Sequence, residues 1–159
     1  FELFEELLLL VHHEVARHRV IIRKEWPDAA IHAKIDPEKV KQAFLNIMLN
    51  AIQAMPKGGI LALRLKETAL HDYSGVTEAR RAVTIEFADE GEGIPKELQG
   101  RVFDPFFTTR PQGTGLGLTI TKKIVDIHQG TISIDSNPGK GVTVRISLPV
   151  EPEPLQENS

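Results

Sequence analysis

Four segments of this 159-residue chain carry an apolar residue at every second position, with mostly polar residues between them. Such alternation predicts strands with one buried and one solvated face. Strands of this kind favour a largely antiparallel sheet with helices on a single face, in two layers. A doubly wound parallel sheet would need continuously apolar strands, which the sequence lacks. The apolar positions are Leu61, Leu63 and Leu65; Val83, Ile85 and Phe87; Ile132 and Ile134; and Val142, Val144, Ile146 and Leu148.

Helices are predicted before and between these strands, from apolar residues at helical spacing. Asp36 and Pro37 form a strong helix start, as an N-cap followed by proline at the first position. Polar, irregular residues 67–82 predict a loop, and the acidic, aperiodic residues 151–159 predict a disordered tail. The predicted helices are 1–19, 37–55, 95–102 and 116–129, with short additional strands at 20–22 and 30–35 and a hairpin turn at 137–141.

The predicted helix 37–55 is apolar almost all round, apart from a narrow polar stripe. A solvated stripe normally carries charges, and asparagine disfavours a helix interior. Asn46 and Asn50 are four residues apart and face the same way, so their carbonyl oxygens could bind a hard cation such as Mg²⁺. Two surface amides without a function are the alternative. The stripe consists of Lys39, Gln42, Asn46, Asn50 and Gln53.

Asp89 continues the buried face of the predicted strand around residues 83–87. A buried carboxylate is costly unless it has a hydrogen-bonding partner. Gly91 and Gly93 follow it and allow close approach of the backbone. The pattern indicates a binding turn, with a plain Asp-Gly turn as the alternative.

Residues 106–118 run from two phenylalanines through hydroxyls and a cation to three glycines spaced one apart. A glycine-rich turn that enters a helix presents unpaired N–H groups and the positive end of the helix dipole, which suits phosphate. A flexible loop before a packing helix is the alternative. The G-x-G-x-G spacing fits neither the Rossmann nor the P-loop pattern, and the H-R-D and D-F-G motifs of protein kinases are absent from the sequence.

Composition excludes several other classes of function. A net charge of -3 gives no electrostatic reason to expect nucleic acid as a partner. The absence of cysteine excludes disulfides and thiolate metal sites. The longest apolar run, residues 7–11, is too short to span a bilayer. Because the chain begins at Phe1, we expect a single domain cut from a longer protein.

Four motifs in a fixed order closely resemble those of the catalytic ATP-binding domain of sensor histidine kinases, in particular the nitrogen-regulatory branch. They match the N box, the first glycine box, the F box and the second glycine box of that family. The resemblance covers residues 1–149. The motifs are Asn46-Ile-Met-Leu-Asn50-Ala51, Asp89-Glu-Gly91-Glu-Gly93, Phe103-Asp-Pro-Phe106-Phe107 and Gly113-Thr-Gly115-Leu-Gly117-Leu118.

This resemblance implies the Bergerat (GHKL-type) ATP-binding fold. That fold is an α/β (α+β) two-layer sandwich, in which a mixed, largely antiparallel sheet of about five strands is covered on one face by three helices. The implied domain spans residues 1–150, with 1–19 as the helix that leads into it, and residues 151–159 are the tail.

The resemblance also implies roles for the matching residues. Asn50 would bind Mg²⁺, and Asn46 would face the phosphates of ATP or ADP or the waters of the metal. Asp89 would accept a hydrogen bond from the adenine amino group. Arg110 would stabilise charge on the γ-phosphate, so Asn46 and Arg110 are the implied catalytic residues. The remaining nucleotide contacts implied are Gly91, Gly93 and Ile94 at the base; Phe107, Thr108 and Thr109 in the lid; and Gly113, Thr114, Gly115, Leu116, Gly117 and Leu118 in the phosphate-binding turn and hinge.

The chain departs from the family pattern at three places. Gln53 stands where many relatives carry lysine, so Arg110 would carry more of the phosphate contact. Residues 142–143 are Val-Thr where relatives often have two threonines, which puts a hydroxyl contact to adenine in doubt. His13 is followed by glutamate but lacks the proline of the phosphoacceptor motif. We therefore expect a chain that binds ATP and has no acceptor histidine of its own.

The implied function is transfer of the γ-phosphoryl from Mg-ATP to a histidine on the dimerisation domain of the same kinase, and then to a response regulator receiver domain. The fragment is expected to be monomeric and its parent homodimeric. The implied location is cytoplasmic, whether or not the parent is anchored in a membrane, without membrane contact by this domain.

Two alternatives are an ATPase clamp related to Hsp90, gyrase or MutL, and a nucleotide-binding module without catalysis. The clamp proteins resemble one another in carrying glutamate at the position of Asn46, because a water must be deprotonated. An amide cannot act as that base, whereas a neutral imidazole is already nucleophilic. Asn46 therefore favours the kinase.

Overall fold

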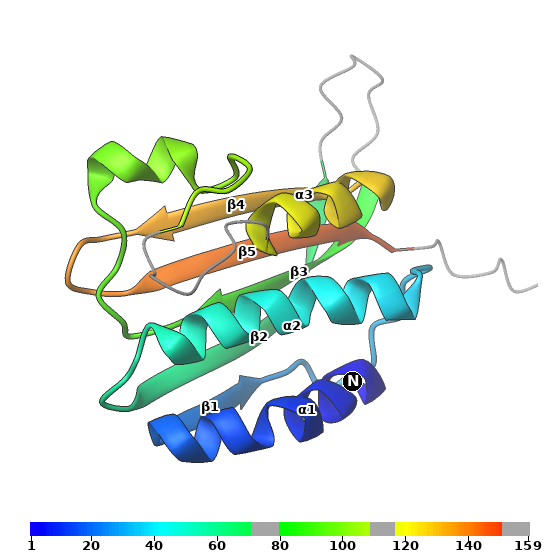
Figure 1. The fold of residues 1–159 in the computed structure, drawn as a ribbon. Coiled ribbons are helices and arrows are strands. Elements are labelled where there is room, and N and C mark those ends of the chain that lie inside the picture. The colour runs from blue at the N-terminus through cyan, green and yellow to red at the C-terminus, as the bar shows by residue number, and fades with distance from the viewer. Residues whose placement is uncertain (71–79, 109–116, 151–159) are drawn as a thin grey trace, which may run out of the picture.

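The computed structural model, which describes residues 1–70, 80–108 and 117–150, contains one five-stranded sheet in the order β1-β2-β3-β5-β4 (Figure 1). β1 pairs parallel with β2, and every other pair in the sheet is antiparallel. The predicted mixed, largely antiparallel sheet is therefore confirmed. The strands are β1 (Val20–Glu25), β2 (Gly59–Leu70), β3 (Arg80–Ala88), β4 (Thr131–Ser136) and β5 (Val142–Pro149).

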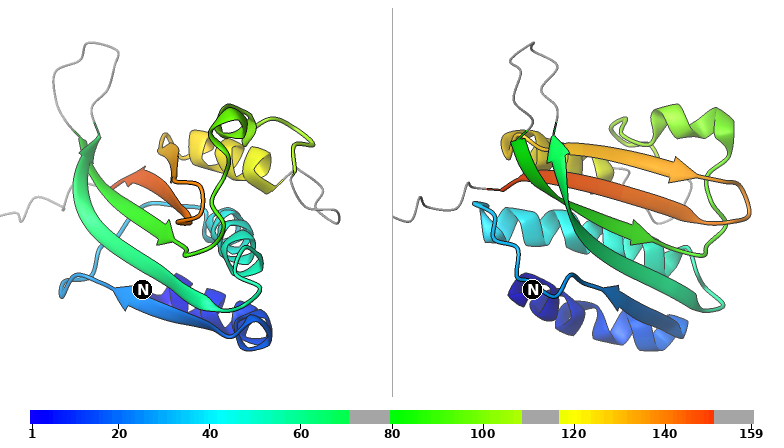
Figure 2. Two further views of the ribbon diagram at one scale, coloured as in Figure 1. Left: turned by 90° about the vertical axis from the view of Figure 1, so that its left-hand side faces the viewer. Right: turned by 180° about the vertical axis from the view of Figure 1, so that it is seen from behind.

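Three α-helices cover one face of this sheet, and the turned views show the sheet and the helices as two separate layers (Figure 2). A short 3-10 helix, η1, lies beside β4. Among the described residues, no helix has both the length and the hydropathy that crossing a bilayer would require. The helices are α1 (Glu2–His18), α2 (Pro37–Gln53), η1 (Lys96–Arg101) and α3 (Gly117–Ile127).

Helix α2 occupies the middle of the helical layer, between α1 and α3. Its start is as predicted, because the Asp36 carboxylate accepts a hydrogen bond from the Lys39 N–H at 3.2 Å and Pro37 occupies the first turn. Its Phe44 ring packs between Phe4 of α1 and Phe87 of β3, with ring centroids 5.4 and 5.2 Å away. These three rings join both layers in one core.

Two predicted segments differ from the structure. Residues 30–35 form no strand, although Ile31, Ala33 and Ile35 pack against the core. The alternating apolar residues of this segment are partly buried on one side, but among the described residues the segment has no neighbouring strand with which its backbone could pair. The predicted loop 67–82 is partly strand, since β2 continues to Leu70 and β3 starts at Arg80. Polar cross-strand contacts replace apolar alternation there, such as the 2.8 Å hydrogen bond between the hydroxyls of Thr68 and Thr84. The rest of that loop and the predicted tail lie outside the described residues.

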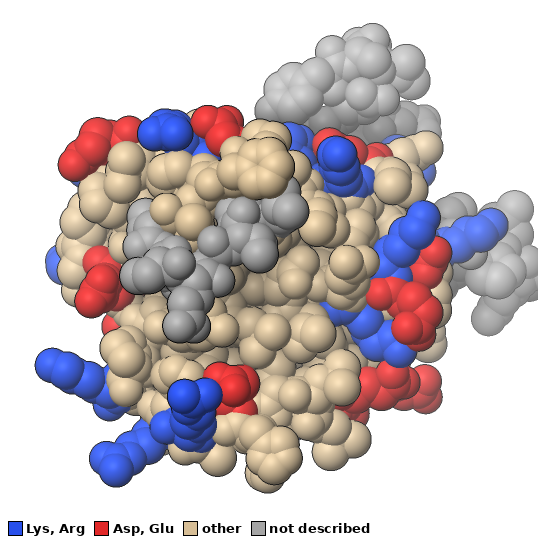
Figure 3. Space-filling view, in the orientation of Figure 1, with Lys and Arg blue, Asp and Glu red and all other residues tan. Residues whose placement is uncertain are grey.

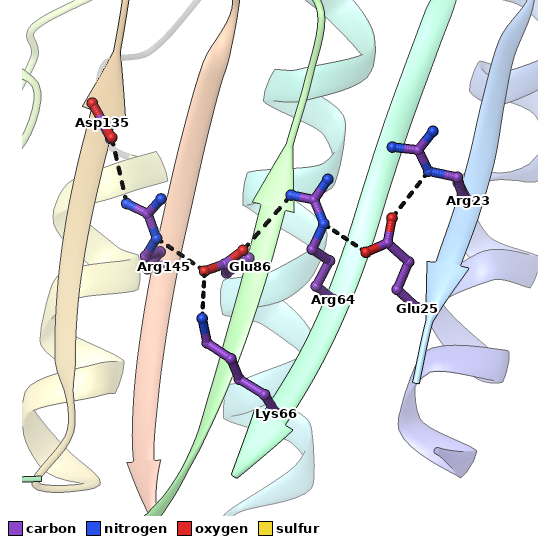
Figure 4. Close-up of polar contacts among 7 residues, drawn as sticks. All are labelled: Arg23, Glu25, Arg64, Lys66, Glu86, Asp135 and Arg145. Atoms are coloured by element: carbon purple, nitrogen blue, oxygen red, sulfur yellow. Dashed lines mark hydrogen bonds and ion pairs between the residues drawn. The ribbon is translucent and has the colours of Figure 1, made fainter. Parts of the chain in front are cut away.

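The outer face of the sheet, opposite the helices, carries a row of alternating charges (Figure 4). Glu25, Arg64, Glu86 and Arg145 are aligned in register across four neighbouring strands. The Glu86 carboxylate lies 3.0 Å from Arg145 Nε, 3.2 Å from Lys66 Nζ and 3.7 Å from an Arg64 nitrogen, and its side chain is only 9% exposed. Burial alone raises the pKa of Glu86, but the hydrogen bonds from Arg145 and Lys66 outweigh it and lower the pKa below the ordinary 4.5. The charged form of Glu86 thus stabilises the fold.

This pKa shift predicts a pH-dependent cost for Glu86→Gln. At pH 7 the variant should unfold about 1–3 kcal/mol more easily, because a charge-assisted network at a nearly buried position is lost. Since the folded pKa of Glu86 is lowered, its contribution is complete above 4.5 and disappears as the pH falls through the lower folded value. Urea unfolding of both proteins between about pH 7 and pH 3.5 measures the difference.

The matched control is Glu67→Gln, which breaks a pair with Arg81 in which both side chains are about half exposed. Its effect should stay within about 1 kcal/mol. A Glu86→Gln deficit that stays constant over the whole pH range would show that the charge of Glu86 is not what stabilises the sheet.

Candidate functional site

The polar stripe of α2 is at least partly exposed to solvent along its length. Asn46 and Asn50 are half-buried, while Gln42 and Gln53 are exposed. In the space-filling view, the charged side chains of the described residues lie mostly around the margin of this face, and the part of its middle that undescribed residues do not cover shows few of them (Figure 3). The predicted polar stripe is therefore present at the surface, with Lys39 as its one charged member.

The start of α3 lies directly beside the two asparagines. A Cβ added to Gly117 would be 3.9 Å from Nδ2 of Asn50 and 4.0 Å from Cβ of Asn46. Leu118 follows in the first turn and is half-buried. The fold thus brings the last glycine of the second glycine motif to the asparagine motif, although more than sixty residues separate them in the chain. The other predicted residues of that turn and of the lid, namely Thr109, Arg110, Gly113, Thr114, Gly115 and Leu116, lie outside the described residues.

Asp89 sits where β3 ends beside the start of β5. Its carboxylate oxygen Oδ1 accepts hydrogen bonds from the N–H of Gly91 at 2.8 Å and from the N–H of Val142 at 3.2 Å. Its own N–H donates to the Val142 carbonyl at 2.9 Å. The carboxylate therefore has partners within the protein, and it joins the turn after β3 to β5. Its contact with adenine stays a prediction.

Gly91 and Gly93 allow two close approaches of the backbone. A Cβ on Gly91 would lie 2.7 Å from the carbonyl oxygen of Ala54, just after α2. Gly93 has φ +76°, and a Cβ there would lie 2.5 Å from the carbonyl oxygen of Asn137 in the β4–β5 hairpin. Both glycines thus hold the turn against the protein itself, whatever they also leave open for a ligand.

Ile94 is positioned by two residues that the sequence analysis missed. The buried hydroxyl of Ser136 accepts a hydrogen bond from the Ile94 N–H at 2.7 Å and donates to the Gly141 carbonyl at 3.2 Å. The side-chain amide of Gln99 donates to the carbonyls of Ile94 at 2.9 Å and Ser136 at 3.0 Å. A signal for Ser136 did exist, because it follows Ile132 and Ile134 in the buried phase of its strand.

The three phenylalanines of the phenylalanine motif differ in their surroundings. Phe106 is 75% exposed and has φ +64°. Phe107 is half-buried, with the guanidinium of Arg101 5.0 Å from its ring centre. The Phe103 carbonyl accepts a hydrogen bond from the Thr119 hydroxyl of α3 at 3.0 Å, so Phe103 and Phe107 hold the loop. Thr108, predicted in the lid, is exposed at the end of this described stretch.

The donor set limits how a metal could be held here. Among the described residues, no group of three or more histidine and acidic side chains could enclose a metal ion. Amide oxygens such as those of Asn46 and Asn50 are suitable ligands for Mg²⁺, which keeps several waters and is completed by substrate phosphates. The site therefore fits a magnesium ion that arrives with a phosphate ligand.

Comparisons with known proteins agree with this geometry. The family model described as histidine kinase-, DNA gyrase B-, and HSP90-like ATPase matches residues 35–152. The signal transduction histidine-protein kinase AtoS of Escherichia coli K12 is 38% identical over 95% of the chain, and sporulation kinase A of Bacillus subtilis 168 is 35% identical over 93%. The chain spans 23% of the length of each of these two relatives.

Solved structures of one further kinase are also similar. The nucleotide-free catalytic domain of histidine kinase ThkA has a TM-score of 0.76 and 29% identity, and the match covers 94% of this chain and 91% of that domain. ThkA in complex with the response regulator protein TrrA matches with a TM-score of 0.72 and 28% identity, over 96% of this chain and 40% of the ThkA chain.

The contact of the Asp89 turn with α2 predicts that Gly91→Ala destabilises the fold. The added methyl group would meet the Ala54 backbone, which cannot rotate away, so unfolding should become easier by about 1–3 kcal/mol. Gly100→Ala is the matched control, because a Cβ at Gly100 meets nothing within 4 Å. Urea unfolding of both variants measures the difference, and equal stability would contradict the close approach.

Proposed function

Because the chain belongs to the family of histidine kinase-, DNA gyrase B-, and HSP90-like ATPases, we propose that it binds Mg-ATP and transfers the γ-phosphoryl group to a histidine on the dimerisation domain of the same kinase. The curated relatives AtoS and sporulation kinase A are named as kinases, which supports this branch of the family. A response regulator receiver domain is the proposed final acceptor, as the complex of ThkA with TrrA suggests.

The observation that carries the proposal is the amide of Asn46 beside the start of α3. An enzyme that hydrolyses ATP, or phosphorylates a hydroxyl, needs a base to take a proton from the attacking oxygen. An amide cannot do so. A neutral imidazole attacks through a nitrogen lone pair and needs no such base. The residue at this position therefore favours a histidine acceptor over the clamp-type ATPase.

The proposed arrangement of the nucleotide follows from the positions of the two motifs. The phosphates lie over the start of α3, where N–H groups and the helix dipole favour an anion. Mg²⁺ binds Asn50, with Asn46 facing the phosphates or the metal's waters, since both side chains adjoin Gly117. Adenine lies at Asp89, whose carboxylate accepts from the amino group, with Ile94 packed against the base. Arg110 is the proposed cation for the transferred phosphoryl.

The acceptor histidine is proposed to lie on another domain. His12 and His13 are exposed on α1, which packs against α2 in the helical layer. Neither lies in the sequence context of the family's phosphoacceptor. Phosphotransfer would then need a second domain to approach the site, and the proposed location of both is the cytoplasm.

Mixing this domain with the dimerisation domain of its own kinase tests the function. With ATP radiolabelled at the γ-phosphate, we expect label on the partner that is labile in acid and stable in base, as for a phosphohistidine. Magnesium-dependent release of phosphate without the partner would favour the ATPase clamp instead. ATP binding without label or release in any mixture would favour a binding module.

Asn50→Ala tests the proposed metal ligand. We expect affinity for ATP to fall about tenfold in the presence of Mg²⁺, equivalent to ~1.4 kcal/mol, and to change little in EDTA, because only the metal contact is removed. Titration calorimetry with and without Mg²⁺ measures both values. Gln42→Ala is the control, as an exposed amide on the same stripe two turns away. An equal loss with and without magnesium would assign Asn50 to another role.

A further inference from the structure

We propose that His128 is a positioning residue, which fixes α3 along α2 so that Gly117 lies beside Asn46 and Asn50. The inference rests on the proposed function, because it concerns the same nucleotide site. His128 follows the last residue of α3, and its ring joins that end of the helix to the start of α2. We call this contact the His128–Asp36 clasp.

Both ring nitrogens of His128 take part in hydrogen bonds. The backbone N–H of Asp36 donates to Nε2 at 2.9 Å, and Nδ1 lies 2.7 Å from the Ile124 carbonyl oxygen. A carbonyl can only accept, so Nδ1 carries the proton, and Nε2 is free to accept. The imidazole is therefore neutral, with each nitrogen in a defined role. One bond is local to α3, and the other joins the two helices.

Asp36 is itself a fixed point. Its carboxylate caps α2 through the Lys39 N–H, and its carbonyl accepts the N–H of Val40 at 3.0 Å. The Asp36 N–H lies outside the helical ladder of α2, so the imidazole is its partner in the fold. Because Asp36 is fixed in this way, the hydrogen bond to His128 fixes the end of α3 relative to the start of α2.

The lengths of the two helices connect the clasp to the site. α2 and α3 run in opposite directions, because the end of α3 meets the start of α2 while the start of α3 meets Asn46 and Asn50 (Figure 1). At 1.5 Å per residue, Gly117 lies roughly 16 Å back from His128, while Asn46 and Asn50 lie roughly 15 and 21 Å along α2 from Asp36. The clasp therefore sets Gly117 within the span of the two asparagines.

Other contacts also hold α3. Its buried side chains Ile124 and Val125 pack in the core through non-directional apolar contacts, whereas the clasp is a directed hydrogen bond between the two helices. The Thr119 hydroxyl bonds to the Phe103 carbonyl, which lies in a loop. A shift of about 1 Å at a site of phosphoryl transfer is enough to reduce the rate strongly. The clasp is suited to prevent such a shift.

Two variants separate the two bonds of His128. In His128→Gln, the side-chain carbonyl reaches the position of Nε2 and can accept from Asp36. In His128→Asn, the shorter amide can donate to the Ile124 carbonyl in place of Nδ1 but cannot reach Asp36. The two amides have the same chemistry and differ by one methylene, so they are matched controls for one another.

We expect His128→Gln to resemble the wild type. His128→Asn should bind Mg-ATP about tenfold more weakly, the equivalent of one lost directed contact. In the ligand-free protein, the side-chain amide NMR signals of Asn46 and Asn50 should move in His128→Asn and stay in place in His128→Gln. Should His128→Asn fail to fold, His128→Ala replaces it, with the same expected movement.

The NMR signals also separate this inference from the proposed function. Movement of these signals in the Asn variant supports the clasp even if the wild type transfers no phosphate to a dimerisation domain. The clasp would be overturned if both variants gave the same Asn46 and Asn50 signals and the same ATP affinity, and differed only in their stability in urea. Wild-type transfer with equal rates in all variants would likewise leave the kinase proposal standing and overturn the clasp.

Discussion

Helix α2 packs against the sheet, α1 and α3, and this threefold contact determines which of its residues remain for chemistry. Its buried side chains belong to one continuous core with both neighbouring helices and with β2, β3 and β5. What remains is the amide stripe, half-buried where α3 begins. A charge at Asn46 or Asn50 would lose part of its hydration there, whereas an amide is desolvated at far lower cost. Burial at this point therefore costs less with an amide than with a charged side chain.

The two ends of the candidate site are held by different kinds of contact. At the Asp89 end, one carboxylate oxygen binds two backbone N–H groups, and Gly91 presses the turn against the end of α2. Gly141, with φ +94°, lets the β4–β5 hairpin approach the Asp89 carbonyl. At the α3 end, Gly117 lies beside the asparagines without a tight contact. The predicted adenine side is thus rigidly built into the sheet, and the phosphate side depends on how α3 is aligned.

The sequence predicts most elements because burial of one face leaves a period of two or 3.6 in the residues. The same rule explains the failure at 30–35, where alternation reports burial and not pairing with another strand. The rule also does not predict that Phe106 is exposed, because a residue in a loop belongs to no helical or strand period that would assign it to a buried or an exposed face. The motifs singled out Asp89, Asn46 and Asn50, whose contacts with a nucleotide stay a prediction. The contact between Asp36 and His128 joins residues 92 positions apart, and no local pattern reveals it.

The two faces of the molecule differ in how their charges are arranged. On the outer face, the positive charges of Arg64, Lys66 and Arg145 are paired with the carboxylates of Glu25, Glu86 and Asp135, so those charges largely neutralise one another within the sheet. On the helical face, the charged side chains of the described residues lie mostly around the margin (Figure 3). Asn46 and Asn50 bring no charge of their own to the start of α3, where the helix dipole favours an anion. In the proposed function, such amides suit an enzyme whose acceptor supplies its own nucleophile.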